Sequence, residues 1–164
     1  MRKSLRTALS ICAFGLGGVT TLSLDACSSL LKNMPQYAVD SADIASGLTT
    51  AVHDMEQAKL LSAPTAEALD AALVDVNSAA TAVAHDTALA SASSDVSKLV
   101  SAANVVVADL AGAPKLPASV RDILDAAQTL MPVIEASVGI VVPASASISM
   151  TPEAARNILE HAGH

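Results

Sequence analysis

Apolar residues that recur at alternating intervals of three and four are the feature of this sequence that most restricts its fold. Such spacing places the residues on one stripe of an α-helix. Four stripes follow one another along the chain: Ile44, Leu48, Ala51, Met55, Ala58 and Ser62; Leu69, Leu73, Val76, Ala80, Val83, Thr87 and Ala90; Val96, Leu99, Ala103, Val106 and Leu110; and Val120, Leu124, Ala127, Met131, Ile134, Val138 and Val141. The pattern predicts an all-α fold, an alanine-rich antiparallel bundle of about four helices with coiled-coil-like packing.

Turn-forming residues divide these stripes into separate helices. We expect the first three helices over about 38–61, 66–90 and 95–111. The second and third stripes are out of phase by one residue, so a single long helix would have to rotate its apolar face between them. We therefore predict a break in the serine cluster 91–94.

The fourth helix follows the clearest turn signal in the chain. In the segment 112–117 a Gly that favours a helix end is followed by a Pro that can open the next helix. Pro132 lies inside the fourth stripe and removes one backbone hydrogen bond, although the stripe continues past it. Val, Ile and Ser gather over 137–148, where a single β-strand is the alternative.

Two threonines are expected to cap helices, because Thr65 precedes the second apolar stripe and Thr151 precedes a proline. Thr65 is the predicted N-cap of the second helix, and Thr151 begins a short C-terminal helix. In that last helix we expect Ile158 and Leu159 to face inward.

The side chains available for the core are small, and aromatic residues are almost absent. After residue 26 the chain has 35 Leu, Val and Ile against 31 Ala, and Tyr37 is its one aromatic residue. The sequence therefore argues against sites that stack nucleic-acid bases and against aromatic cages that bind cations. The same part of the chain holds 6 Lys and Arg against 15 Asp and Glu, a net charge of −9. An acidic body of this kind argues against nucleic acid as a partner.

The N-terminus is typical of an export signal. Three positive charges within residues 1–6 precede an apolar stretch over 7–24 that is broken only by Ser and Thr. Gly15, Gly17 and Gly18 lie in the middle of this stretch, and cleavage after residue 26 is the favoured interpretation.

The residues that follow this stretch are Leu24-Asp25-Ala26-Cys27-Ser28-Ser29. They resemble the lipobox of bacterial lipoproteins, in which a peptidase cuts ahead of a cysteine that carries diacylglycerol. The resemblance implies a signal peptide over 1–26 and an acylated Cys27, bearing chains such as palmitate, at the start of a lipidated tether over 27–39. It does not extend to the bundle domain, which the helical stripes predict over 40–164. Ser28 is not the Asp that marks inner-membrane retention in enteric-type lipoproteins, which favours the outer membrane.

Asp25 departs from the lipobox pattern, because the family prefers a small uncharged residue at that place. Ordinary signal peptidase could instead cut after Ala26 and release a soluble protein. Cysteine usage favours lipidation independently: Cys12 lies inside the signal, so Cys27 is the one cysteine of the mature chain and has no intramolecular partner. The alternatives for its thiol are a free group or an intermolecular disulfide.

No motif in the chain indicates catalysis. His53-Asp54 and His85-Asp86 are adjacent pairs whose side chains diverge by about 100° on a helix, and both histidines fall outside the apolar stripes. His161 and His164 lack a third rigid metal ligand, and Ser94-Asp95-Val96-Ser97-Lys98 fits an N-cap with an Asp–Lys pair better than a nucleophile. We therefore expect no enzymatic activity, cofactor or metal.

The function that these observations favour is that of a lipid-anchored, periplasm-facing structural or interaction protein of the cell envelope. A homo-oligomer or an envelope protein partner would complete its thin core, with Ile140 and Val142 on the covered surface. Two other readings stay open at this point. One is a soluble periplasmic protein that binds a small apolar ligand, and the other is an uncleaved, signal-anchored membrane protein.

Overall fold

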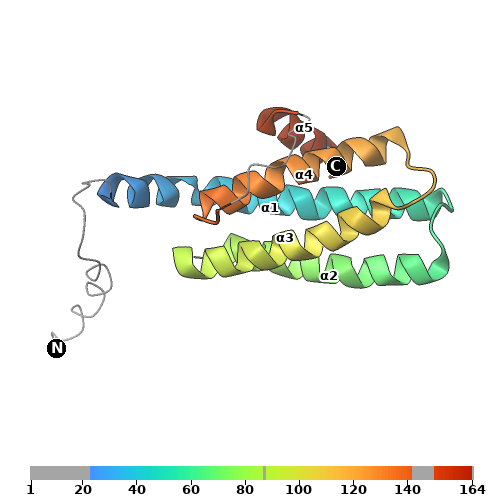
Figure 1. Ribbon diagram of the computed structural model, residues 1–164, viewed down its shortest axis with the longest axis horizontal. Coiled ribbons are helices and arrows are strands. Elements are labelled where there is room, and N and C mark those ends of the chain that lie inside the picture. Colours follow the sequence, from blue (N-terminus) through green and yellow to red (C-terminus); the bar gives the residue numbers. More distant parts are fainter. Residues whose placement is uncertain (1–22, 87, 142–149, 164) are drawn as a thin grey trace.

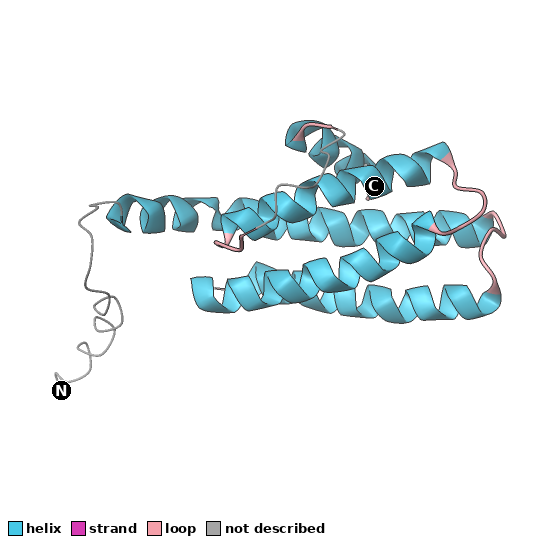
Figure 2. Cartoon of the chain, viewed as in Figure 1, coloured by secondary structure: helices cyan, strands magenta, loops and turns pink. Residues whose placement is uncertain are grey.

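A computed structural model of the chain describes residues 23–86, 88–141 and 150–163. Their secondary structure consists of α-helices joined by loops, and Figure 2 shows no strand among them. The helices are α1 (Ser23–Gln57), α2 (Ala63–His85), α3 (Leu89–Ala111), α4 (Ala118–Ser137) and α5 (Pro152–Ala162). The predicted all-α bundle of four helices with a short C-terminal helix is confirmed. Of the signal expected over 1–26, residues 1–22 lie outside the described residues.

The first four helices run alternately in opposite directions along one axis (Figure 1). Helix α1 packs against α2 and α4, and α3 packs against the same two neighbours. The short α5 lies across α1 and α4, on the side away from α2 and α3 (Figure 1). Short connections between consecutive helices account for this antiparallel arrangement.

The predicted apolar stripes form the core wherever they lie inside a helix. Their buried members in the first three helices are Ile44, Leu48, Ala51, Met55, Leu69, Leu73, Val76, Ala80, Val83, Val96, Leu99, Ala103, Val106 and Leu110. In α4 the buried members are Val120, Leu124, Ala127, Met131 and Ile134, and the C-cap Val138 is buried as well. Small side chains at Ala80 and Ala103 let the helix backbones approach closely, at the expense of buried area per residue.

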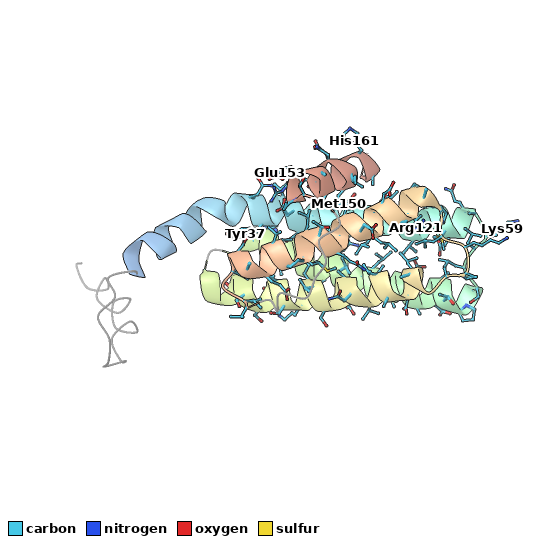
Figure 3. The ribbon with its side chains drawn as sticks, turned by 45° about the horizontal axis from the view of Figure 1, so that its top comes forward. Tyr37, Lys59, Arg121, Met150, Glu153 and His161 are labelled. Atoms are coloured by element: carbon cyan, nitrogen blue, oxygen red, sulfur yellow. The ribbon has the colours of Figure 1, made fainter. Side chains whose placement is uncertain are left out.

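Helix α1 begins before the position that the sequence predicts. The segment 27–39 lacks a sustained apolar period and was expected to be an irregular tether, but the helix is continuous from Ser23. The first described buried side chain is Tyr37, and the part of α1 that precedes it projects beyond the other helices (Figures 1 and 3). Backbone hydrogen bonds can extend a helix outside the core, where an apolar period is not needed.

The connection between α1 and α2 also differs from expectation. Helix α1 ends at Gln57, where Lys59 takes a left-handed conformation (φ 55°), so Ala58 and Ser62 lie outside the helix and are exposed. The N-cap of α2 is Ser62 rather than Thr65; its hydroxyl accepts a hydrogen bond from the Thr65 N–H at 3.4 Å. Pro64 explains the earlier start, because proline is well tolerated in the first turn of a helix.

The break between α2 and α3 precedes the serine cluster. Asp86 caps α2 in an extended conformation, and α3 begins at Leu89, so residues 91–94 lie inside α3. Serine hydroxyls in this region donate to backbone carbonyls three or four residues back, as Ser91 does to Ala88 (2.9 Å). These bonds satisfy the hydroxyls within a helix. Thr87 and the side chain of Ala90 lie outside the described residues.

The C-terminal part follows the sequence prediction except at the end of α4. The turn over 112–117 and the N-cap Thr151 are confirmed, as is Pro132 inside α4. Helix α4 ends at Ser137 because Gly139 takes a left-handed conformation (φ 82°), and Val141 is therefore exposed rather than part of the stripe. Of the predicted inward pair in α5, Leu159 is buried and Ile158 is half-buried.

Candidate functional site

Cys27, the predicted lipidation residue, lies in the part of α1 that projects from the bundle. Cys27 lies ten positions before Tyr37 in α1, and at 1.5 Å per helical residue this corresponds to about 15 Å along the axis. The described side chains begin at Gln36, so the backbone position of Cys27 is what the structure supplies. Cys27 is therefore well separated from the packed core.

The most specific polar contact among the described residues joins α1 to α5. Arg156 donates from Nε to Asp40 Oδ1 at 2.8 Å and from Nη2 to Asp40 Oδ2 at 2.9 Å. Gln36 Nε2 donates to the same Asp40 Oδ1 at 2.8 Å. The Asp40 residue is 1% exposed, whereas the Arg156 side chain is 29% exposed. A bidentate pair of this geometry fixes both the position and the rotation of α5 on α1.

The charge of Arg156 is reinforced by this environment. Its hydrogen bond to Asp40 raises the pKa of the guanidinium above the usual arginine value, more than burial lowers it, and the charges of Asp40, Glu153 and Asp43 act in the same direction as the hydrogen bond. The guanidinium therefore keeps its positive charge opposite the Asp40 carboxylate. Beside this pair, Ser41 Oγ is buried without a hydrogen-bond partner.

Close packing continues the α1–α5 contact toward the chain end. A Cβ atom added to Gly47 would lie 2.6 Å from Leu159 Cδ2, so the glycine creates the space for that leucine. Thr50 Oγ1 donates to the Ala162 carbonyl at 2.9 Å, which satisfies one of the open acceptors at the end of α5. We call the contacts of Asp40, Gly47 and Thr50 with α5 the α5 clamp.

Sequence reasoning missed this clamp. Asp40 and Arg156 are 116 positions apart, and no local pattern relates them. The available signal was Arg156 itself, because it is one of only six basic residues after the signal and lies on a short amphipathic helix.

The three histidines that the structure describes do not come together in a site. His53, His85 and His161 are exposed, which confirms that His53 and His85 lie off the buried seam. His53 Nε2 contacts Gln57 Nε2 (2.7 Å), and His161 Nδ1 contacts the Asn157 carbonyl (2.6 Å). His164 lies outside the described residues. Within 23–86, 88–141 and 150–163, no group of three or more His, Cys, Asp or Glu side chains is placed to hold a metal ion.

The Asp95–Lys98 ion pair forms as the sequence predicts, with 2.6 Å between Lys98 Nζ and Asp95 Oδ1. It lies well inside α3 rather than at its start, so Ser94 is not an N-cap. The pair borders a shallow groove of about 860 Å³ between α2 and α3, which is lined mainly by Ala and Ser. A smaller groove of about 430 Å³, between α1 and α2, is lined by Ala, Ser, Thr and Asn77.

No helix in the described part of the chain is both long and apolar enough to cross a membrane. Comparison with protein-family models, with curated proteins and with solved structures finds no match to this chain.

Proposed function

We propose that this protein is a lipid-anchored helical module of the bacterial cell envelope, which faces the periplasm and acts through its helix surfaces. The observation that carries the proposal is the sequence Leu24-Asp25-Ala26-Cys27 after a basic and apolar N-terminus. Cys27 would be the acylated first residue of the mature chain, and the outer membrane is the favoured location.

The geometry of α1 is compatible with this anchor. Cleavage ahead of Cys27 would remove only Ser23–Ala26 from the helix and would leave every described buried side chain in place. The remaining helical segment before Tyr37 would then act as a stalk of about 15 Å between lipid and bundle. This stalk takes the role that the sequence assigned to an irregular tether.

The rest of the surface supports an interaction role rather than catalysis. The described grooves are lined mainly by Ala, Ser and Thr, with Asp75, Asp95 and Lys98 in the larger one, and such small side chains let another helix pack closely. The α5 clamp shows how this chain already holds a short helix against α1. We propose that binding to a further copy or to an envelope protein uses surfaces of this type.

Replacing Cys27 with Ser tests the anchor. The variant should move from the membrane fraction to the soluble fraction or remain an uncut precursor, because each buried CH₂ of an acyl chain contributes about 0.8 kcal/mol to membrane binding. Cys12→Ser is the matched control, since Cys12 lies inside the predicted signal and should not alter fractionation. A Cys27→Ser protein that is processed and stays membrane-bound as before would contradict the proposal.

The intact mass of the membrane-extracted protein separates the proposal from its rivals. A lipidated chain that begins at Cys27, an unmodified cleaved chain and a chain that retains residues 1–26 have clearly different masses. A companion change, Asp25→Ala, should speed maturation because it restores a small uncharged residue to the lipobox. Equal maturation rates for the two forms would show that Asp25 is tolerated there.

A further inference from the structure

A well-defined turn at the end of α4 leaves an aliphatic side chain exposed to solvent. The Gly139 N–H donates to the Ala136 carbonyl at 3.2 Å, and the Ile140 N–H donates to the Glu135 carbonyl at 2.9 Å. With Gly139 at φ 82°, these two bonds form a Schellman motif. Ile140 is half-buried, and Val141, the next residue, is 91% exposed. The exposure of Val141 is thus imposed by the cap of the helix.

This turn lies at the end of the bundle from which α1 projects. Figure 1 shows the last turn of α4 beside the point where α1 leaves the other helices, and Figure 3 places Tyr37 at that same end. Val39, two residues beyond Tyr37 in α1, is also exposed. By contrast, Val74 and Val105, the exposed valines of α2 and α3, lie on the long sides of the bundle.

The sequence that follows Glu135 is poor in charge. No Asp, Glu, Lys or Arg occurs between Glu135 and Glu153, the longest uncharged interval after Lys32. The mature chain has a net charge of −9, so most of its surface is repelled by anionic headgroups. The residues that follow Glu135 add nothing to that repulsion, and among the described residues Val141 is the most exposed large aliphatic side chain.

We propose that Val141, together with Ile140, contacts the lipid surface, and that this contact tilts the bundle so that the end of α4 faces the membrane. The inference rests on the proposed lipid anchor at Cys27. An anchor at a single residue leaves the tilt of the bundle free, and a stalk of about 15 Å lets the end of α4 reach the bilayer only when the bundle leans over. Burial of Val141 in the interface favours that tilt over one that turns α2 and α3 toward the membrane.

The chain contains no Trp, so a single introduced Trp reports its own surroundings. The test uses the full chain, matured and lipidated in cells, extracted and reconstituted into phosphatidylcholine vesicles whose acyl chains carry bromine near the headgroup. Val141→Trp is compared with Val74→Trp, which replaces a valine that is 68% exposed on α2. Circular dichroism of both variants verifies the fold, and intact mass verifies the lipid.

We expect the bromolipid to quench the fluorescence of Val141→Trp and to leave that of Val74→Trp unchanged. If the mass confirms lipidation and neither position is quenched, the contact proposed for Val141 is wrong while the anchor stands. Equal quenching at both positions would overturn the proposed tilt. A second copy of the chain could also cover Val141→Trp. In that case a water-soluble quencher would fail to reach the Trp even without vesicles, and this result would also overturn the proposed lipid contact. A mass without lipid would overturn the anchor and this inference together.

Discussion

The ion pair between Asp40 and Arg156 makes the strongest prediction about stability. Replacing Arg156 with Met removes both guanidinium hydrogen bonds and leaves the Asp40 carboxylate with only the Gln36 amide. Breaking a buried ion pair from one side costs about 3–5 kcal/mol, because the remaining charge is left without compensation. Since water reaches Arg156, we expect a smaller loss than for a fully buried pair, about 2–3 kcal/mol. That is a substantial share of the about 5–15 kcal/mol that stabilises a typical domain.

Urea unfolding of the mature chain carrying Cys27→Ser, followed by circular dichroism, measures this loss. Limited proteolysis of the same samples shows whether α5 detaches first, since the clamp joins α5 to α1. The informative partner is the double variant Asp40→Leu with Arg156→Met. Removing both charges eliminates the buried unpaired carboxylate, so the double variant should be more stable than the single one.

Two results would refute this reasoning. The first is a loss below about 1 kcal/mol in Arg156→Met, which is the value of an exposed ion pair. The second is a double variant that is no more stable than Arg156→Met, because the cost would then not come from an uncompensated charge at Asp40.

Three further predictions concern packing, the histidines and assembly. Gly47→Ala should destabilise the domain, because overpacking costs about 1–3 kcal/mol and outweighs the about 1 kcal/mol gained in helix propensity. In thermal unfolding, this loss should be smaller when Gly47→Ala is combined with Leu159→Ala, which removes the side chain that the new Cβ would meet. Additive losses would show that the two residues do not compete for space. His53→Gln with His85→Gln should change the free energy of unfolding by no more than about 0.5 kcal/mol, since both side chains are exposed, and a loss above about 2 kcal/mol would give these residues a role. The unlipidated domain should self-associate, because its core relies on alanine. Light scattering should then give a molar mass above that of a monomer, and the melting temperature should fall across a hundredfold dilution. A monodisperse monomer with a concentration-independent melting temperature would disprove self-association.

The positions of helix ends show where local sequence information stops. The period of the apolar stripes predicts the helices and their buried faces, because a helix must turn one stripe toward its neighbours. The stripe itself does not record where the helix ends. Val141 continues the period of α4 and is nevertheless exposed, because Gly139 ends the helix first. The opposite case is Ala92, which continues the stripe of α3 into the serine cluster and is buried, because the helix extends that far.

Sequence alone determined the all-α class, the turn over 112–117, the Thr151 cap and the outward position of His53. These features depend on residues close in the chain, whose spacing and turn chemistry act locally. Only the tertiary structure decided that Asp40 meets Arg156 across 116 positions and that Gly47 makes room for α5. Such contacts depend on how separate helices are brought together, which the pattern of any one helix does not contain. The proposed lipidation of Cys27 is of the opposite kind, since a short lipobox-like sequence carries the prediction and packing has no part in it.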